Sequence, residues 1–516
     1  MKYKRSSGII LHPTSLPGPY GIGDLGPEAY RWIDFLAQTG CSLWQVLPLG
    51  PTGYGDSPYQ CFSAFAGNPY LVSPARLLAD DLLNTNDLVE TPRFPINRVD
   101  FGAVIYWKLG VLDRAFIRFK NLAFPQIKEE YDRFQAEQAD WLDDFALFMA
   151  IKEAHGGAPW PSWGLPLRQR DPKALADARQ DLAVACERQV FRQFLFFRQW
   201  ADLRAYAIRK GVQIIGDVPI FVAHDSADVW AHPELFFMDK KGNPTVVAGV
   251  PPDYFSPTGQ LWGNPLYRWN VHAESGYAWW LERLKAVLHL VDIIRLDHFR
   301  GFAGYWEVPA SQPTAEKGSW VPGPGADFFT KVLQALGELP LIAEDLGEIT
   351  PDVIALRDQF DLPGMKVLQF AFGGDTFSVA AFLPHNYSPL CVAYTGTHDN
   401  DTTLGWYQSS PESERDFCRR YLGRASDDIV WNIIRAAWSS VAVFALTTMQ
   451  DLLNLDTGAR MNFPGRPSGN WSWRMPAHAL NLDLRDRLSE FNYVYGRGKI
   501  VKEEVVKEES LQVETE

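Results

Sequence analysis

Eight short apolar segments recur along the chain, and most of them end in polar or turn-forming residues. They are 8–15, 43–50, 212–219, 292–298, 340–347, 365–372, 391–400 and 441–448. All but the first two are nearly continuous apolar runs, which is typical of parallel strands covered on both faces. Helical patterns lie between most of them, for example at 27–40, 278–290 and 350–360. This alternation predicts an α/β fold, a (β/α)₈ TIM barrel.

Two of the predicted connections are too long for a minimal barrel. The second-to-third connection, 51–210, contains long helical patterns, so we expect a mainly helical insertion subdomain there. The third-to-fourth connection, 220–275, is rich in Pro, Gly and aromatic residues, and we expect it to carry an active-site loop. Long insertions commonly shape the mouth of a barrel at its C-terminal face. The chain, 1–516, is thus predicted to be one catalytic barrel that ends in a charged tail, 500–516.

The charge balance of the chain narrows the classes of partner. Its 516 residues carry a formal net charge of −13, with a pI near 5.3. Nucleic acids and anionic membranes select for basic surfaces, so neither is expected as a partner. Aromatic residues make up 14% of the chain and include 19 Trp, which fits either a well-packed core or stacking against sugar rings. Composition leaves these two interpretations open.

Cysteine usage and the N-terminus indicate the compartment. The five cysteines are scattered and show no CxxC pair, which predicts neither a disulfide framework nor a zinc site and fits a reducing compartment. The apolar run near the N-terminus is only "GIIL", too short for a signal peptide. No segment approaches the roughly 20 apolar residues of a membrane-spanning helix. We therefore expect a cytoplasmic protein.

Acidic and basic side chains gather at the ends of the predicted strands, where the chemistry of a TIM barrel takes place. They are Asp217, Arg295, Asp297, Glu344, Asp345, His398 and Asp399. Side chains two apart on a strand share a face, so Arg295 and Asp297 are both expected to face the mouth. Glu344 and Asp345 are adjacent and should point apart, so only one of them is expected to be catalytic.

Carboxylates that converge from several strands suit acid–base work on a glycosidic bond. A retaining mechanism needs an ionised nucleophile and a protonated acid roughly 5–5.5 Å apart. A guanidinium neighbour favours the ionised form, which gives Arg295 a reason to lie beside Asp297. Three other interpretations stay open on these residues alone: a structural ion pair, helix caps, or a Ca²⁺ or Mg²⁺ site in "THDND".

Long motifs resemble glycoside hydrolase family 77, the amylomaltase-type 4-α-glucanotransferases of the α-amylase-like barrel group. They include "LHPTSLPGPYGIGDLG", "GDVPIFVAHDSADVW", "RLDHFRGF", "AEDLG", "YTGTHDNDT" and "RMNFPGRPSGNWSWR", and they span nearly the whole chain. The resemblance implies that Asp297 is the nucleophile, Glu344 the general acid/base and Asp399 the acid that stabilises the transition state. It assigns no metal or other cofactor.

The same resemblance implies the substrate contacts. Those at the cleaved bond are Asp217, Arg295, His298 and His398, and those on the acceptor side are Ser57 and Tyr59. The segment "PPDYFSPTGQLWGNP" is similar to the family's mobile loop over the active site, and its residues Gln260, Trp262 and Asn264 are expected near the sugar. Asp375 is a further, donor-side contact. Arg466 departs from the small polar residue expected in its motif and is predicted to alter only an outer contact. The family's larger branch has an N-terminal carbohydrate-binding module, which we do not expect here.

The resemblance therefore predicts an enzyme that moves α-1,4-glucan segments from a donor to the 4-hydroxyl of an acceptor glucan or glucose. The alternative is an α-glucan hydrolase that uses the same residues with water as acceptor. A carbohydrate-binding protein on an inactive barrel would have no need of the three acids, and no phosphate-binding glycine motif follows a strand. Expected partners are maltooligosaccharides and α-1,4-glucans, with the protein a monomer or a weak homo-oligomer.

Overall fold

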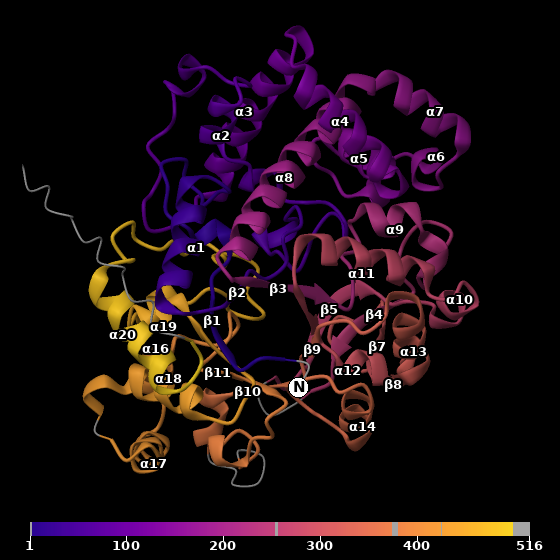
Figure 1. Cartoon of the computed structure of the whole chain (residues 1–516). Coiled ribbons are helices and arrows are strands. Elements are labelled where there is room, and N and C mark those ends of the chain that lie inside the picture. Colours follow the sequence, from indigo (N-terminus) through magenta and orange to yellow (C-terminus); the bar gives the residue numbers. More distant parts are fainter. Residues whose placement is uncertain (1–2, 253–255, 374–379, 425, 499–516) are drawn as a thin grey trace, which may run out of the picture.

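A closed barrel of eight parallel strands organises the chain, which is described by a computed structural model over residues 3–252, 256–373, 380–424 and 426–498 (Figure 1). The strands are β1 (Ser6–Ile10), β2 (Leu43–Gln45), β3 (Gln213–Pro219), β6 (Ile293–Asp297), β9 (Leu341–Ala343), β10 (Gly364–Val367), β11 (Cys391–Tyr394) and β12 (Phe444–Thr448). They pair in the order β10-β11-β12-β1-β2-β3-β6-β9. The backbone N–H of Ala343 donates to the carbonyl oxygen of Pro363 at 2.9 Å and joins β9 to β10. The predicted TIM barrel is confirmed.

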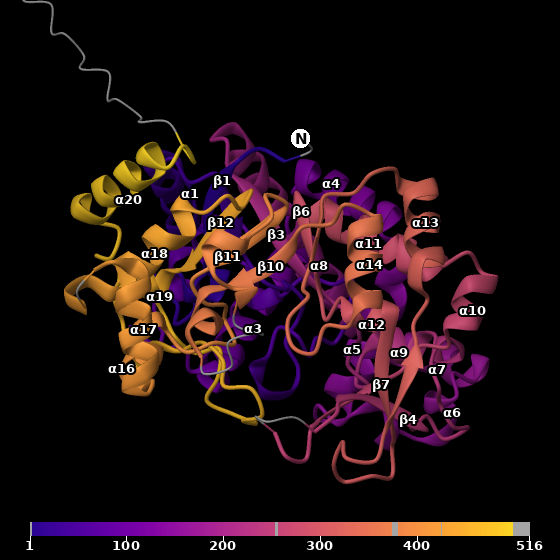
Figure 2. The same cartoon turned by 90° about the horizontal axis from the view of Figure 1, so that it is seen from below.

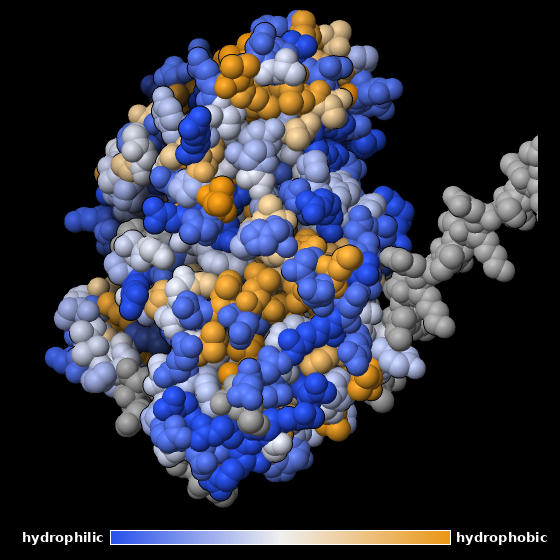
Figure 3. Space-filling view, turned by 90° about the vertical axis from the view of Figure 1, so that its left-hand side faces the viewer, coloured by the Kyte–Doolittle hydropathy of each residue, from blue (hydrophilic) through white to orange (hydrophobic). Residues whose placement is uncertain are grey.

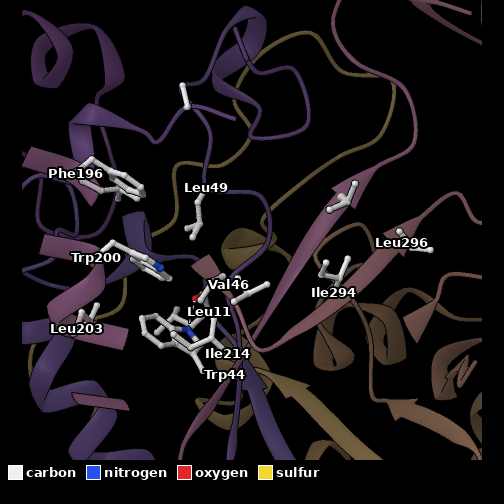
Figure 4. Packing of buried hydrophobic residues seen from close by; sticks show 14 of the residues in the cluster. Leu11, Trp44, Val46, Leu49, Phe196, Trp200, Leu203, Ile214, Ile294 and Leu296 are labelled. Atoms are coloured by element: carbon white, nitrogen blue, oxygen red, sulfur yellow. Dashed lines mark hydrogen bonds between the residues drawn. The ribbon is translucent and has the colours of Figure 1, made fainter. Parts of the chain in front are cut away.

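The two faces of the barrel strands contribute to two different cores. Leu43, Ile215 and Ile293 belong to the cluster inside the barrel, whereas their neighbours Trp44 and Ile214 belong to the cluster outside it. Figure 4 shows part of this outer cluster, where Trp44 lies close to Trp200 of α8 (Ala183–Arg209) and Trp200 stacks on Phe196 of the same helix. Since side chains alternate along a strand, the positions that follow Ile215 and Ile293 by two residues also face inward. Those positions are Asp217 and Arg295.

Helices surround the barrel strands, as the alternation requires. The helices predicted at 27–40, 278–290 and 350–360 are confirmed. They are α1 (Pro27–Thr39), α11 (Ala278–Leu290) and α14 (Pro351–Gln359). In Figure 2, α1 lies on one side of the strands with α18 (Ile429–Ser439) and α20 (Leu482–Val494), and α11 and α14 lie on the other with α13 (Gly325–Leu336). Gly40 ends α1 with φ 76°, a left-handed conformation that glycine adopts without steric cost.

The long connection between β2 and β3 is built from helices. They are α2 (Pro74–Ala79), α3 (Phe101–Asn121), α4 (Pro125–Glu137), α5 (Ala139–Ala154), α6 (Leu165–Arg168), α7 (Pro172–Asp181) and α8 (Ala183–Arg209). They form the upper part of the molecule in Figure 1. The last of them, α8, returns the chain to the barrel, where the indole N–H of Trp200 donates to the carbonyl of Leu290 at 2.8 Å.

A second, antiparallel sheet is a feature that we did not predict. It has the strand order β5-β4-β7-β8 and consists of β4 (Val246–Val250), β5 (Gln260–Pro265), β7 (Gly304–Pro309) and β8 (Ser319–Pro322). Its strands come from two separate connections, and each is short and bordered by Gly or Pro, so local periodicity gave no signal. The sheet matters because β5 carries Gln260, Trp262 and Asn264.

Several strands end earlier than predicted. The segment 391–400 is a strand only to Tyr394, because the backbone N–H and the hydroxyl of Thr397 both donate to Asn400 Oδ1 at 2.9 Å and close a turn. The segment 8–15 leaves its strand at Ile10, and a 3₁₀ turn starts at Pro13. The polar ends of these segments therefore lie in loops at the mouth of the barrel.

The surface and the cysteines add three observations. The face in Figure 3 is largely hydrophilic and is interrupted by separate apolar areas. All five cysteines are free. Among the described residues, no helix is both long and apolar enough to cross a membrane. The predicted charged tail, 500–516, lies outside the described residues.

Candidate active site

A buried guanidinium, that of Arg295, links two carboxylates at the C-terminal end of the barrel. Its Nη1 donates to Asp217 Oδ2 at 2.6 Å and to Asp297 Oδ1 at 2.8 Å. The side chains of Arg295 and Asp217 are 4% and 0% exposed, while that of Asp297 is 25% exposed. Burial alone would lower the pKa of Arg295, but the charges of Asp217 and Asp297 outweigh it and hold this pKa well above its ordinary value. The expected shared face of Arg295 and Asp297 is confirmed.

Asp217 is held by two further residues, one on β2 and one in the loop after it. Gln45 Nε2 donates to its Oδ1 at 3.2 Å, and the Tyr59 hydroxyl donates to its Oδ2 at 2.6 Å. The Tyr394 hydroxyl in turn donates to Gln45 Oε1 at 3.1 Å. We did not predict Gln45 or Tyr394, although each is a polar-tipped residue at the end of a barrel strand.

Asp297 keeps one carboxylate oxygen free of the guanidinium. Burial raises the pKa of Asp297, the charge of Arg295 lowers it, and the negative charges of Asp217 and Asp399 raise it, so the net direction is upward. The ion pair with Arg295 fixes Oδ1, and Oδ2 remains for other partners. The partial exposure of Asp297 means that a molecule at the mouth can reach it.

Glu344 lies in the loop that follows β9 and is held by backbone donors. The N–H of His298 donates to Oε2 at 2.7 Å, and the N–H of Leu346 donates to Oε1 at 2.9 Å. Burial raises the pKa of Glu344 to about 7, with the charge of Asp297 adding to the effect and that of Arg295 opposing it. His298 itself has φ 55°, an uncommon conformation for a residue with a side chain. Glu344 is thus a carboxyl that can hold a proton near neutral pH.

Asp345 points away from Glu344 and supports the barrel. Its Oδ2 accepts from Arg357 Nη1 at 2.6 Å, and its Oδ1 accepts from the N–H of Met365 at 2.6 Å. These bonds tie the loop after β9 to β10. The two adjacent acids therefore face different parts of the molecule, as expected.

Asp399 is paired with His398 on the opposite side of the mouth. His398 Nε2 lies 3.2 Å from Asp399 Oδ2, and Asn462 Nδ2 donates to Oδ1 at 2.6 Å. Burial alone would raise the pKa of Asp399, but His398 and Asn462 outweigh it, so this pKa lies well below its usual range. The Asp399 side chain is 46% exposed. We did not predict a role for Asn462, which lies far along the chain in a loop.

Two aromatic contacts line the mouth. Tyr59 stacks on His398 with ring centroids 5.0 Å apart and an angle of 14° between the planes. Trp262 meets His298 edge-on, with centroids 4.7 Å apart, and donates from its indole N–H to Gln260 at 3.2 Å. The structure therefore brings strand β5 to the C-terminal end of β6.

The other residues that the resemblance singled out differ in their distance from the mouth and in their exposure. Ser57 accepts a hydrogen bond from the N–H of Tyr59 at 3.2 Å and so lies beside it. Asn264 is only 6% exposed and donates to the carbonyl of Val222 at 2.9 Å, which is a supporting position in this structure. Asp375 lies outside the described residues. Arg466 is exposed and packs its guanidinium 4.1 Å from the ring centre of Phe463.

The oxygen-rich segment "THDND" is occupied by protein contacts. Asn400 bonds Thr397, and the carboxylate of Asp401 accepts from Thr457 at 2.8 Å and from the N–H of Thr402 at 2.8 Å. Within the described part of the chain, no group of three or more His, Cys, Asp or Glu is arranged to hold a metal ion.

Comparison with known proteins agrees with this geometry. Residues 11–481 match the model of glycoside hydrolase family 77, described as 4-alpha-glucanotransferase. The chain belongs to this family. It is 54% identical over 496 residues to a 4-alpha-glucanotransferase of Thermus thermophilus, covering 95% of this chain and 98% of the relative. A 4-alpha-glucanotransferase of Synechocystis is 51% identical over 498 residues, covering 96% and 98%.

Solved structures give the same result. An amylomaltase from Streptococcus agalactiae in complex with acarbose superposes with a TM-score of 0.93 at 39% identity, covering 96% of this chain and all of that one. An amylomaltase from Corynebacterium glutamicum is 18% identical with a TM-score of 0.78 and shares the fold. The family and the 4-α-glucanotransferase class that the sequence predicted are confirmed.

The adjacent acids Asp345 and Glu344 should respond differently to substitution. Asp345→Ala leaves Arg357 Nη1 and the N–H of Met365 without their acceptor, so we expect the free energy of unfolding to fall by about 3 kcal/mol. Glu344→Gln keeps the shape and one of the two backbone hydrogen bonds at a partly exposed position, so we expect a smaller loss of about 1 kcal/mol. Urea unfolding followed by circular dichroism measures both. Equal losses in the two variants would contradict the separate positions assigned to them.

Proposed function

We propose that the chain transfers α-1,4-glucan segments by a retaining double displacement, with Asp297 as nucleophile and Glu344 as general acid and base. The observation that carries this proposal is the pairing of Asp297 with Arg295 and of Glu344 with backbone N–H groups at one mouth. Two carboxyl groups in different surroundings can hold different protonation states, which the reaction needs.

In the first step, Asp297 attacks the anomeric carbon of the donor. Arg295 holds Oδ1, so Oδ2 is the oxygen that forms the new bond. Glu344 gives its proton to the glycosidic oxygen as the bond from that oxygen to the anomeric carbon breaks, and the released glucan leaves with a free 4-hydroxyl. The products are a β-glycosyl ester on Asp297 and an ionised Glu344.

In the second step, an acceptor glucan or glucose takes the place of the released chain. Glu344 removes the proton of the acceptor's 4-hydroxyl, and that oxygen attacks the anomeric carbon and displaces Asp297. A new α-1,4 bond forms, and both carboxyl groups return to their starting states. The two inversions give net retention, and the cycle needs neither a metal nor another cofactor.

Asp399 is proposed to stabilise the positive charge that develops on the donor sugar. Its pairing with His398 and Asn462 keeps it ionised, and its exposed oxygens are free to accept hydrogen bonds from sugar hydroxyls. Such bonds are more valuable in the transition state than in the ground state, because the sugar becomes more positive there. His298 and His398 are proposed to contact the same sugar. The Asp217 side chain is 0% exposed, so Asp217 is proposed to act by holding Arg295 and Tyr59 and not by the direct sugar contact that the resemblance implies.

Trp262 and the loop before β5 are proposed to favour a sugar acceptor over water. Trp262 already lies against His298 at the mouth, and Gln260 is exposed beside it. A bound, oriented acceptor competes with water through its high effective concentration, and a covering loop keeps bulk water out. Residues 253–255 of that loop lie outside the described residues. Ser57 and Tyr59 are proposed to add acceptor contacts, and Asp375 a donor contact.

The proposal extends to partners and location. Maltooligosaccharides and α-1,4-glucans are the proposed substrates, supported by the acarbose complex of the Streptococcus agalactiae amylomaltase. We further propose a cytoplasmic monomer or weak homo-oligomer without nucleic-acid or membrane partners. The five free cysteines and the net charge of −13 support this part.

The nucleophile is tested by Asp297→Asn. The amide keeps the shape of the side chain but is a poor nucleophile, so we expect the transfer rate to fall by roughly 10⁴-fold or more, as for removal of other catalytic groups. Circular dichroism and the melting temperature should show an intact fold. Asp358→Asn, at an exposed acid on α14, serves as the control, with unchanged turnover expected. A variant at position 297 with near-normal turnover would overturn the assignment.

The pH profile tests the pairing of Asp297 with Glu344. The reaction needs Asp297 ionised and Glu344 protonated, so kcat/KM should be bell-shaped and should fall as pH rises through about 7, where Glu344 loses its proton. The acid limb should lie above the usual aspartate range, because the pKa of Asp297 is raised. The two limbs belong to the coupled pair.

Glu344→Gln identifies the group behind the alkaline limb. An activated donor with a good leaving group needs no proton in the first step, so glycosyl transfer to the enzyme should survive in this variant without the fall near neutral pH. The burst of released leaving group measures that step. Persistence of the alkaline limb in Glu344→Gln would assign it to another residue.

The balance between transfer and hydrolysis is tested with maltotriose. Transfer keeps the number of reducing ends constant while chains lengthen and glucose appears, whereas hydrolysis adds one reducing end per turnover. We expect nearly constant reducing ends for the unmodified enzyme and a share of hydrolysis about threefold higher in Trp262→Ala, because an acceptor contact is lost. The neighbouring Leu261→Ala is the matched control, since Leu261 lies on the opposite face of β5. Equal shares in both variants would remove the acceptor role from Trp262.

A further inference from the structure

Trp471 adopts a backbone conformation that its side chain disfavours. Its φ is 62°, in the left-handed region, and its side chain is only 3% exposed. For a bulky residue such a φ is an outlier, whereas glycine or asparagine would take it at little cost. Outliers of this kind persist where the surrounding structure enforces them, and they cluster at functional sites.

The segment around Trp471 is held on both sides. The N–H of Trp471 donates to the carbonyl of Met461 at 2.8 Å. Before it, Asn470 accepts from the N–H of Phe463 at 3.0 Å, and after it the carbonyl of Ser472 accepts from the N–H of Val99 at 2.7 Å. The indole therefore has a fixed position, and the backbone cannot relax without breaking these bonds.

The fixed indole packs against two rings of the active site. Its ring centre lies 5.7 Å from that of Tyr59 and 5.6 Å from that of His398, with angles of 36° and 35° between the planes. Tyr59 and His398 themselves stack at 5.0 Å. The three rings form a cluster in which each member contacts the other two.

Tyr59 and His398 each contact a different carboxylate. The Tyr59 hydroxyl donates to Asp217, which shares the guanidinium of Arg295 with the proposed nucleophile. His398 Nε2 pairs with Asp399, the proposed stabilising acid. The opposite walls of the mouth are thus connected through one aromatic cluster, in which both Trp471 and His398 are buried.

We propose that Trp471 is a positioning residue that sets the spacing between the Asp217–Arg295–Asp297 group and the His398–Asp399 pair. The inference rests on the function proposed above. The Trp471 side chain is only 3% exposed and packs against Tyr59 and His398, so it acts through those two rings and not by touching the glucan. The strained backbone at Trp471 keeps a large rigid ring where a smaller residue would leave both rings free to shift.

Trp471→Phe tests the proposal because phenylalanine fills less space at the same place. We expect kcat to fall about tenfold with KM changed less than about threefold, since small displacements of catalytic groups cost up to about 10²-fold in rate. The matched control is Trp32→Phe, another fully buried tryptophan, which lies on α1 against Phe35 and Trp44. Its melting temperature should fall at least as far while kcat stays unchanged. A parallel loss of kcat and melting temperature in both variants would overturn the inference.

Trp471→Gly separates strain from positioning. Glycine adopts φ 62° freely but removes the indole. If only the backbone conformation at position 471 mattered, Trp471→Gly would keep its activity. The proposal instead predicts a kcat below that of Trp471→Phe, because the ring is gone. If Trp471→Gly fails to fold, the Phe variant and the cycle below still decide.

A double-mutant cycle shows whether Trp471 acts through Tyr59. In the Tyr59→Ala background one of the two rings is gone, so Trp471→Phe should cost about threefold or less in kcat in place of about tenfold. The same factor in both backgrounds would contradict the inference. Asp297→Asn is measured alongside. If Asp297→Asn is active, the proposed function is refuted. If it is inactive but Trp471→Phe costs the same factor with and without Tyr59, only the role of Trp471 is refuted.

Discussion

The site depends on one buried positive charge. Arg295 lies inside the barrel, where a guanidinium is costly to bury unless carboxylates neutralise it. Two do so, Asp217 from β3 and Asp297 from the end of β6, and they share its Nη1. Removing any of the three would leave an uncompensated charge next to the others. The arrangement fixes the orientation of Asp297 before a substrate arrives, which is the preorganisation that catalysis by charged groups requires.

The barrel supplies the geometry for this charge cluster. Alternation along β3 and β6 places Asp217, Arg295 and Asp297 above the apolar interior formed by residues such as Ile215 and Ile293. The apolar layer below excludes water, so the charges interact in surroundings of low dielectric constant. Glu344 lies next to the same interior, and burial raises its pKa to about 7. The two-residue alternation of side chains along β3 and β6 therefore determines both where the charged groups lie and how apolar their surroundings are.

Local pattern predicted much of this architecture but not all of it. The eight strands and the inward face of Arg295 and Asp297 follow from apolar runs and two-residue alternation. The ends of the strands did not follow, because turns such as that closed by Asn400 on Thr397 depend on side-chain hydrogen bonds. The antiparallel sheet was missed, since β4 and β7 come from different connections.

Local sequence pattern also could not predict hydrogen bonds between residues that are distant in the sequence. Tyr394 reaches Gln45 across 349 positions, and Asn462 reaches Asp399 across 63, so no window of sequence contains either pair. Chemical roles came from family resemblance and not from spacing. The pattern of acids allowed a retaining glycosidase-type reaction, a metal site or structural ion pairs, and only long motifs such as "RLDHFRGF" distinguished them.

Capture of the covalent intermediate tests the central claim most directly. Glu344→Gln should accept a glycosyl group from an activated α-glycosyl fluoride but should fail to pass it on, because no base remains to activate the acceptor. Intact-protein mass spectrometry would then show an increase of one glycosyl unit, and peptide mapping would place it on the peptide that contains Asp297. No adduct, or an adduct on the peptide of Asp217 or Asp399, would contradict the account.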